Sequence, residues 1–196
     1  MVRRLMRLAG ALALSVAAPV AVAVPISFLA TLTGPNENPP NNSTAAGTAR
    51  VTIDTDANTL SFDVQFSGLG APTSAAHIHC CTNPPSNVGV AVTAAPSLEG
   101  FPLGVQLGTY TATFNTELSS TYRPAFITGF GGGTVAGAEA ALLNGLLSGT
   151  AYFNIHTTAF PNGEIRGFFA ETPEPGALAL VTLGLAALGL ARRRMR

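Results

Sequence analysis

The chain has 196 residues, and its ten arginines balance ten acidic residues without a single lysine. Seven of the arginines lie near the two ends, so residues 24–171 hold three arginines against nine acids, a net charge of −6. Binders of nucleic acid or anionic membranes need clustered basic side chains. The composition therefore argues against nucleic acid as a partner of this middle segment.

Residues 1–23 predict a secretory signal peptide. Three arginines within the first seven residues precede an uncharged run over residues 8–24, and this run contains Ala21-Val22-Ala23, a small-x-small cleavage pattern. We expect the Sec translocon to export the chain and signal peptidase to cut after Ala23. The remaining residues up to 171 have the length of one domain.

Between the termini, apolar residues recur with a period of two, which is typical of strands with one face on a core. The clearest case is residues 60–66, which a polar turn over residues 54–58 connects to residues 49–53 as a predicted hairpin. Clusters of Gly, Pro, Asn and Ser separate the strands, so we expect an all-β antiparallel sandwich or barrel. The other predicted strands cover residues 26–33, 75–79, 89–93, 108–114, 150–156 and 165–169.

One short helix is expected in this domain. Residues 135–147 place Ala138, Ala141, Leu142 and Leu146 on one helical face. The pattern stops before Gly149, a residue type that often follows the end of a helix.

The three histidines of the chain fall on predicted strands. His77 and His79 are two residues apart and so share one strand face, which Cys81 would join if the strand extended that far. His156 lies on a second strand, on the same face as Asn154. If the two strands are neighbours, the imidazoles and the thiolate could bind copper or zinc, which favour nitrogen and sulfur ligands.

The alternative is a structural role for the same histidines. Buried polar groups are usually hydrogen-bonded, and cross-strand bonds to Asn154 or Glu164 would order the sheet without a metal. The sequence leaves both interpretations open.

Cys80 and Cys81 are the only cysteines, and they are adjacent. Because an exported chain meets an oxidising environment, three states are considered: a disulfide between the neighbours, an intermolecular disulfide, and metal ligation. We favour the adjacent disulfide, which would lock a turn directly after the histidine strand.

Glu164 and Arg166 are two residues apart on another predicted strand, after the turn-forming Pro161-Asn162-Gly163. We predict a structural ion pair or a cross-strand hydrogen bond for both side chains. In the alternative, the Glu164 carboxylate orients a metal-bound imidazole.

The C-terminal residues predict a sorting signal that enters a membrane. Pro173-Glu174-Pro175 precedes an uncharged apolar run over residues 176–191, and an arginine cluster follows with Arg192, Arg193 and Arg194. As a helix, the 16 apolar residues would span about 24 Å, less than the roughly 30 Å of a bilayer's hydrocarbon core. They would form a marginal anchor.

This order of parts resembles the PEP-CTERM sorting signal of Gram-negative bacteria. The resemblance implies transient anchoring in the inner membrane, cleavage near Pro173-Glu174-Pro175 by an exosortase-type enzyme, and transfer to the cell envelope or the extracellular space. The alternative is a plain tail anchor that stays uncut.

Three further segments resemble the CHRD domain, named from chordin. They are Gly34-Pro35-Asn36-Glu37-Asn38-Pro39-Pro40, Ala75-Ala76-His77-Ile78-His79, and Tyr152-Phe153-Asn154-Ile155-His156-Thr157-Thr158 followed by Gly163-Glu164-Ile165-Arg166-Gly167. The adjacent cysteines and the stretch from Gly100 to Gly104 fit the bacterial members of the family. The resemblance implies an immunoglobulin-like β-sandwich in a secreted protein, and it implies no settled activity.

We therefore expect a signal peptide over residues 1–23, a CHRD-like domain over 24–171 and a sorting segment over 172–196. The expected role is a non-catalytic module of the envelope or extracellular matrix, with exopolysaccharide or other matrix components as candidate partners. The alternative function is copper or zinc binding, for redox chemistry or metal sequestration, through His77, His79 and His156.

Overall fold

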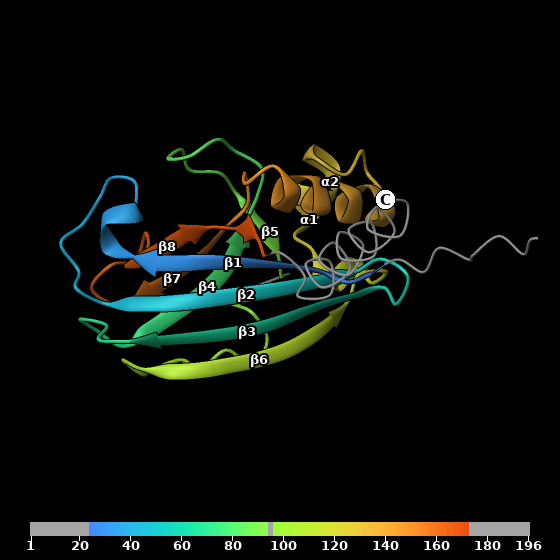
Figure 1. Cartoon of the computed structure of the whole chain (residues 1–196). Helices are drawn as coiled ribbons and strands as arrows, with labels where there is room; N and C mark the ends of the chain where they lie inside the picture. Colours follow the sequence, from blue (N-terminus) through green and yellow to red (C-terminus); the bar gives the residue numbers. More distant parts are fainter. Residues whose placement is uncertain (1–23, 94–95, 173–196) are drawn as a thin grey trace, which may run out of the picture.

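The computed structural model describes residues 24–93 and 96–172, and their strands form one curled antiparallel sheet, a half-barrel (Figure 1). The strand order is β5-β4-β7-β8-β1-β2-β3-β6, and β9 pairs with β1. The prediction of an all-β antiparallel fold is confirmed. The strands are β1 Ile26–Thr33, β2 Ala46–Asp54, β3 Thr59–Ser67, β4 Thr73–His79, β5 Val90–Val92, β6 Gly108–Asn115, β7 Tyr152–Thr157, β8 Ile165–Phe168 and β9 Ala170–Glu171.

The predicted hairpin is formed by β2 and β3, which pair from Ala46 opposite Ser67 to Asp54 opposite Thr59. The Asp54 carboxylate accepts the backbone N–H groups of Asp56 and Ala57 and so closes the turn. Alternate side chains of β3 are buried, as the period of two predicts.

The curl of the sheet brings its two halves onto one hydrophobic core. In Figure 1, β4 and β7 cross behind the layer formed by β1, β2, β3 and β6. The Phe101 ring joins the halves, because its centroid lies 5.5 Å from that of Phe66 on β3 and 6.4 Å from that of Phe153 on β7. Burying each such side chain contributes about 1.5–3 kcal/mol.

The helix α2, Val135–Leu147, has the predicted bounds. The Thr134 hydroxyl caps it by accepting the Gly137 N–H at 3.0 Å, and Ala138, Leu142 and Leu146 are buried along one face. α2 is the main helix of the domain, as expected, and a second helix of six residues, α1, spans Pro124–Gly129. It is too short for a helical period to appear in the sequence.

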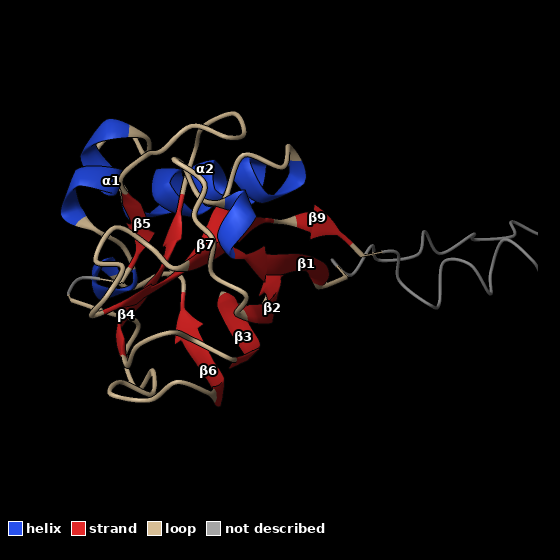
Figure 2. Ribbon diagram, turned by 90° about the vertical axis from the view of Figure 1, so that its left-hand side faces the viewer, coloured by secondary structure: helices blue, strands red, loops and turns tan. Residues whose placement is uncertain are grey.

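Both helices lie at the end of the half-barrel that holds β5 and β7, away from β3 and β6 (Figure 2). Two short 3₁₀ turns, η1 Gly34–Asn36 and η2 Ser119–Thr121, complete the regular structure of the described residues. Within residues 24–93 and 96–172, no helix has both the length and the apolar character required to cross a membrane. The predicted cleavage residues Ala21 and Ala23 and the whole segment from Pro173 to Arg196 lie outside the described residues.

Candidate metal centre

The three histidines meet on one face of the sheet. β4 and β7 are antiparallel neighbours, and their register places His77 opposite Asn154, His79 opposite Tyr152, and His156 opposite Ala75. One potential ligand atom from each histidine lies within 4.8 Å of the other two. The condition that the sequence left open, neighbouring histidine strands, is thus met.

The opposite face of β7 belongs to the core. Phe153 and Ile155 alternate with Asn154 and His156 and pack into the hydrophobic cluster. This separation of faces follows from the strand period of two and keeps the histidines away from the apolar interior.

Each imidazole donates one ring N–H to a backbone carbonyl. His77 Nε2 lies 2.6 Å from the Pro96 oxygen, His79 Nδ1 lies 2.7 Å from the Val88 oxygen, and His156 Nδ1 lies 2.9 Å from the Pro161 oxygen. A carbonyl oxygen can only accept, so these three nitrogens carry the hydrogens. The tautomer of every ring is therefore fixed from outside, an arrangement common around metal-bound histidines.

The remaining ring nitrogens carry lone pairs and point into the cluster. His77 Nδ1 and His156 Nε2 are 3.3 Å apart, while His79 Nε2 is buried and has no hydrogen-bond partner. Burial lowers the pKa of His77 and of His79 to about 4, and burial also lowers the pKa of His156. At neutral pH the three rings are uncharged, and their lone pairs converge without a hydrogen between them.

A column of stacked groups lies behind the cluster. The His79 and Tyr152 rings are parallel within 2°, with centroids 4.7 Å apart, and the Arg166 guanidinium lies 4.9 Å from the Tyr152 centroid. Burial raises the pKa of Tyr152, so its phenol is neutral. Arg166 is fully buried and places a permanent positive charge behind His79.

Arg166 is held by groups from two distant segments. It donates to the carbonyl oxygens of Asn36 and Pro85 and to Asn87 Oδ1, and its Nε lies 3.7 Å from Glu37 Oε2. Arg166 thus forms an ion pair with Glu37, a partner that the sequence did not suggest.

Glu37 is the site residue that sequence reasoning missed. Its carboxyl is buried, and this burial raises its pKa to about 7 even though Arg166 lowers it. Glu37 Oε1 and Asn154 Oδ1 are both buried without a partner, beside Gly163. The one available signal was the position of Glu37 inside the proline-rich segment that carries the resemblance.

Glu164 has a structural role at the start of β8. Its Oε1 accepts from Ser43 Oγ and from the Gly70 N–H, and its Oε2 accepts from Thr157 Oγ1, each at 2.7 Å. These bonds join the loop before β2 and the turn after β3 to β7. The carboxylate is thus engaged away from the imidazoles.

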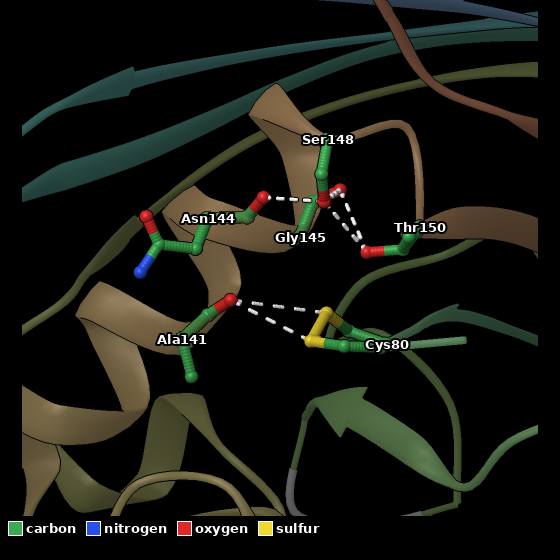
Figure 3. The surroundings of a disulfide bond; sticks show 7 residues. Cys80, Ala141, Asn144, Gly145, Ser148 and Thr150 are labelled. Carbon is green, nitrogen blue, oxygen red and sulfur yellow. Dashed lines mark hydrogen bonds between the residues drawn. A yellow bond between two sulfur atoms is a disulfide. The ribbon is translucent and has the colours of Figure 1, made fainter. Parts of the chain in front are cut away.

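Cys80 and Cys81 form a disulfide with each other. Both sulfur atoms lie near the Ala141 carbonyl of α2, on the helix side of the sheet (Figure 3). β4 ends at His79, so Cys81 does not continue the histidine face. The inclusion of Cys81 among the candidate ligands is therefore corrected: its sulfur is bonded to Cys80 and lies outside the histidine cluster.

Comparison with known protein families gives two matches. The family model of the CHRD domain matches residues 28–169, and the model of the PEP-CTERM protein-sorting motif matches residues 171–194. No curated protein and no solved structure matches the chain.

Proposed function

We propose that this chain, which belongs to the CHRD domain family and carries a PEP-CTERM protein-sorting motif, is an exported domain. We further propose that the domain binds copper or zinc through His77, His79 and His156. The observation that carries this proposal is the pair of facing lone pairs on His77 Nδ1 and His156 Nε2. A cation between them turns a repulsive contact into two coordinate bonds.

The separation of the two nitrogens suits a metal. Two ligands of a tetrahedral ion with metal–nitrogen bonds of about 2.0–2.1 Å lie about 3.3 Å apart. His77 Nδ1 and His156 Nε2 are 3.3 Å apart. The same ion would provide a partner for His79 Nε2, whose lone pair is buried and unsatisfied.

A cross-strand hydrogen bond is a weaker explanation of this contact. His77 and His156 already use their N–H groups on Pro96 and Pro161, so a bond between the rings requires a second proton on one of them. That imidazolium would be buried, and burial lowers the pKa of both rings. Neutral pH therefore favours a metal over a proton.

Metal analysis of the exported protein tests the site. We expect close to one equivalent of copper or zinc, lost in His77→Ala. Glu117→Gln, which changes an exposed acid, serves as the control for unspecific binding to the acidic surface. Less than about a tenth of an equivalent, unaltered by His77→Ala, would overturn the proposal.

The PEP-CTERM motif indicates export to the envelope or extracellular space of a Gram-negative bacterium and processing by exosortase. We propose cleavage near Pro173-Glu174-Pro175 after transient anchoring by residues 176–191. Mass spectrometry of the native product should then find no residues of the arginine cluster. Glu174→Gln should leave the tail attached, whereas the matched change Glu171→Gln should not. An intact wild-type tail would instead support a permanent anchor.

A non-catalytic matrix role is the second candidate. The exposed face of β1, β2, β3 and β6 carries rows of hydroxyls, among which Ser27 bonds Thr52 and Ser61 bonds Thr113. This hydroxyl-rich surface, whose charged residues include Arg50 and Asp63 opposite each other, suits a polysaccharide. Co-sedimentation of the exported protein with purified matrix polysaccharide tests this role, and Thr111→Glu on the same face should reduce it. Equal sedimentation of both proteins would contradict it.

A further inference from the structure

The candidate ligands supply no negative charge. All three are neutral imidazoles, and no carboxylate or thiolate of residues 24–93 or 96–172 belongs to the group. The nearest thiol candidates, Cys80 and Cys81, are joined in a disulfide. A bound ion therefore keeps its whole charge in a buried position, where His77 and His79 are only 7% and 9% exposed.

Fixed positive charge behind the ligands makes the binding of a highly charged cation less favourable. The Arg166 guanidinium stacks on Tyr152, which itself stacks on His79, so a fixed positive charge lies behind the cluster. Glu37 is paired with Arg166, and it is only partly ionised at neutral pH because burial raises its pKa to about 7.

Given the proposed metal site, we propose that its ion is monovalent copper, Cu(I). The desolvation energy of an ion rises with the square of its charge, so a divalent ion pays about four times as much as a monovalent ion of similar size. Cu(I) also accepts three imidazoles as a complete ligand set. Zinc also binds three histidines, with water as its fourth ligand, so the choice between the two ions rests on charge.

Binding of Cu(I) involves no electron transfer within the protein. The ion arrives already reduced, each imidazole donates one lone pair, and no proton leaves the rings. The three carbonyls of Val88, Pro96 and Pro161 keep their hydrogen bonds throughout. The site therefore serves capture or transfer of the ion without chemistry at the disulfide.

Competition titrations of the exported protein test this inference. Under anaerobic conditions with ascorbate, a chromogenic Cu(I) chelator reports Cu(I) affinity, and a zinc chelator reports zinc affinity. We expect Cu(I) to bind at least about tenfold more tightly than zinc, equivalent to about 1.4 kcal/mol. His156→Ala should lose the Cu(I) site, and Glu117→Gln should keep it.

Two further variants test whether the thiols bind the ion and whether charge determines the preference for Cu(I). Thiols bind Cu(I) strongly, so the double variant Cys80→Ser, Cys81→Ser must retain Cu(I) affinity if the histidines hold the ion. Glu37→Gln removes the remaining negative charge and should lower zinc affinity by a larger factor than Cu(I) affinity.

The outcomes separate the two proposals. Equal or tighter binding of zinc overturns the assignment of Cu(I) and leaves the histidine metal site intact. Absence of binding by copper and zinc alike overturns both. Loss of Cu(I) only in the cysteine double variant assigns the ion to reduced thiols and also overturns the inference.

Discussion

Arg166 forms its ion pair with Glu37, Nε to Oε2 at 3.7 Å, and both side chains are buried. The pair ties β8 to the 3₁₀ turn η1 and its flanking loop. It also fixes the position of the guanidinium behind Tyr152 and His79.

Arg166→Lys should destabilise the protein by about 2–4 kcal/mol. Lysine cannot reach the oxygen acceptors of Asn36, Pro85 and Asn87 at once, so hydrogen bonds of a fully buried charged group are lost, each worth about 1.5–3 kcal/mol. Urea unfolding measures the change. The matched substitution Arg50→Lys, on an exposed arginine, should stay within about 0.5 kcal/mol. Equal effects of the two substitutions would show that the hydrogen bonds of the Arg166 guanidinium do not contribute to stability.

Glu164→Gln should destabilise the fold by about 1–3 kcal/mol and leave metal affinity within about twofold of wild type. The amide places a donor against Ser43, Gly70 or Thr157, which all donate to this carboxylate. Chemical unfolding and metal titration together distinguish its roles. A tenfold loss of affinity in folded Glu164→Gln would instead favour an orienting role toward the imidazoles.

Gly145→Ala should cost about 1–3 kcal/mol, because a Cβ there would overlap the Cys80 sulfur and lie 3.0 Å from the Cys81 sulfur. Gly129→Ala is the control: its Cβ would meet nothing within 4 Å, so we expect no loss and a gain of up to about 1 kcal/mol. The penalty at Gly145 should shrink when both cysteines are alanine. An unchanged penalty in that background would place the clash elsewhere.

Metal-free protein should lose stability when the pH falls from about 6.5 to 4. Burial lowers the pKa of His77 and His79 from 6.5 to about 4, so the unfolded chain binds more protons in this range and stability rises with pH. Burial raises the pKa of Glu37 from 4.5 to about 7, which gives the opposite slope: its contribution is present below 4.5 and lost as the pH rises through 7. Two histidines act against one carboxyl, so the net stability of the metal-free protein falls as the pH falls.

Glu37→Gln isolates the opposing slope. The variant should lose stability more steeply than wild type as the pH falls from 6.5 to 4.5. The reason is that Glu37, whose protonation adds stability to the folded state in this range, has been removed. Urea unfolding across this range, with a chelator present, gives the comparison. Identical slopes would mean that Glu37 titrates alike in the folded and unfolded states.

The sequence predicted what local patterns determine. β1 and α2 have the predicted bounds because an alternating run and a capped helical run are visible within one segment. The shared face of His77 and His79 follows from the same period of two. α1 has too few residues to show a period, and its Pro124 start gave no sufficient signal on its own.

The rest depends on contacts between distant segments. Only the sheet order makes β4 the neighbour of β7 and so brings His156 to His77. Glu37 could not be assigned to the site because Arg166 reaches it through the folded chain. The orienting role considered for the Glu164 carboxylate likewise relied on its place in the sequence alone. In the folded chain, three hydrogen bonds to other segments give it a structural role.

Main-chain oxygens, rather than side chains, set the hydrogen positions on the histidine rings. Val88, Pro96 and Pro161 each contribute only the carbonyl group that every amino acid possesses. Evolution can therefore exchange the side chains at these three positions and keep the same ring chemistry, provided that the path of the backbone is preserved. Insertions or deletions near them should be far more damaging than substitutions, so loop length is the trait by which related chains with a working centre can be recognised.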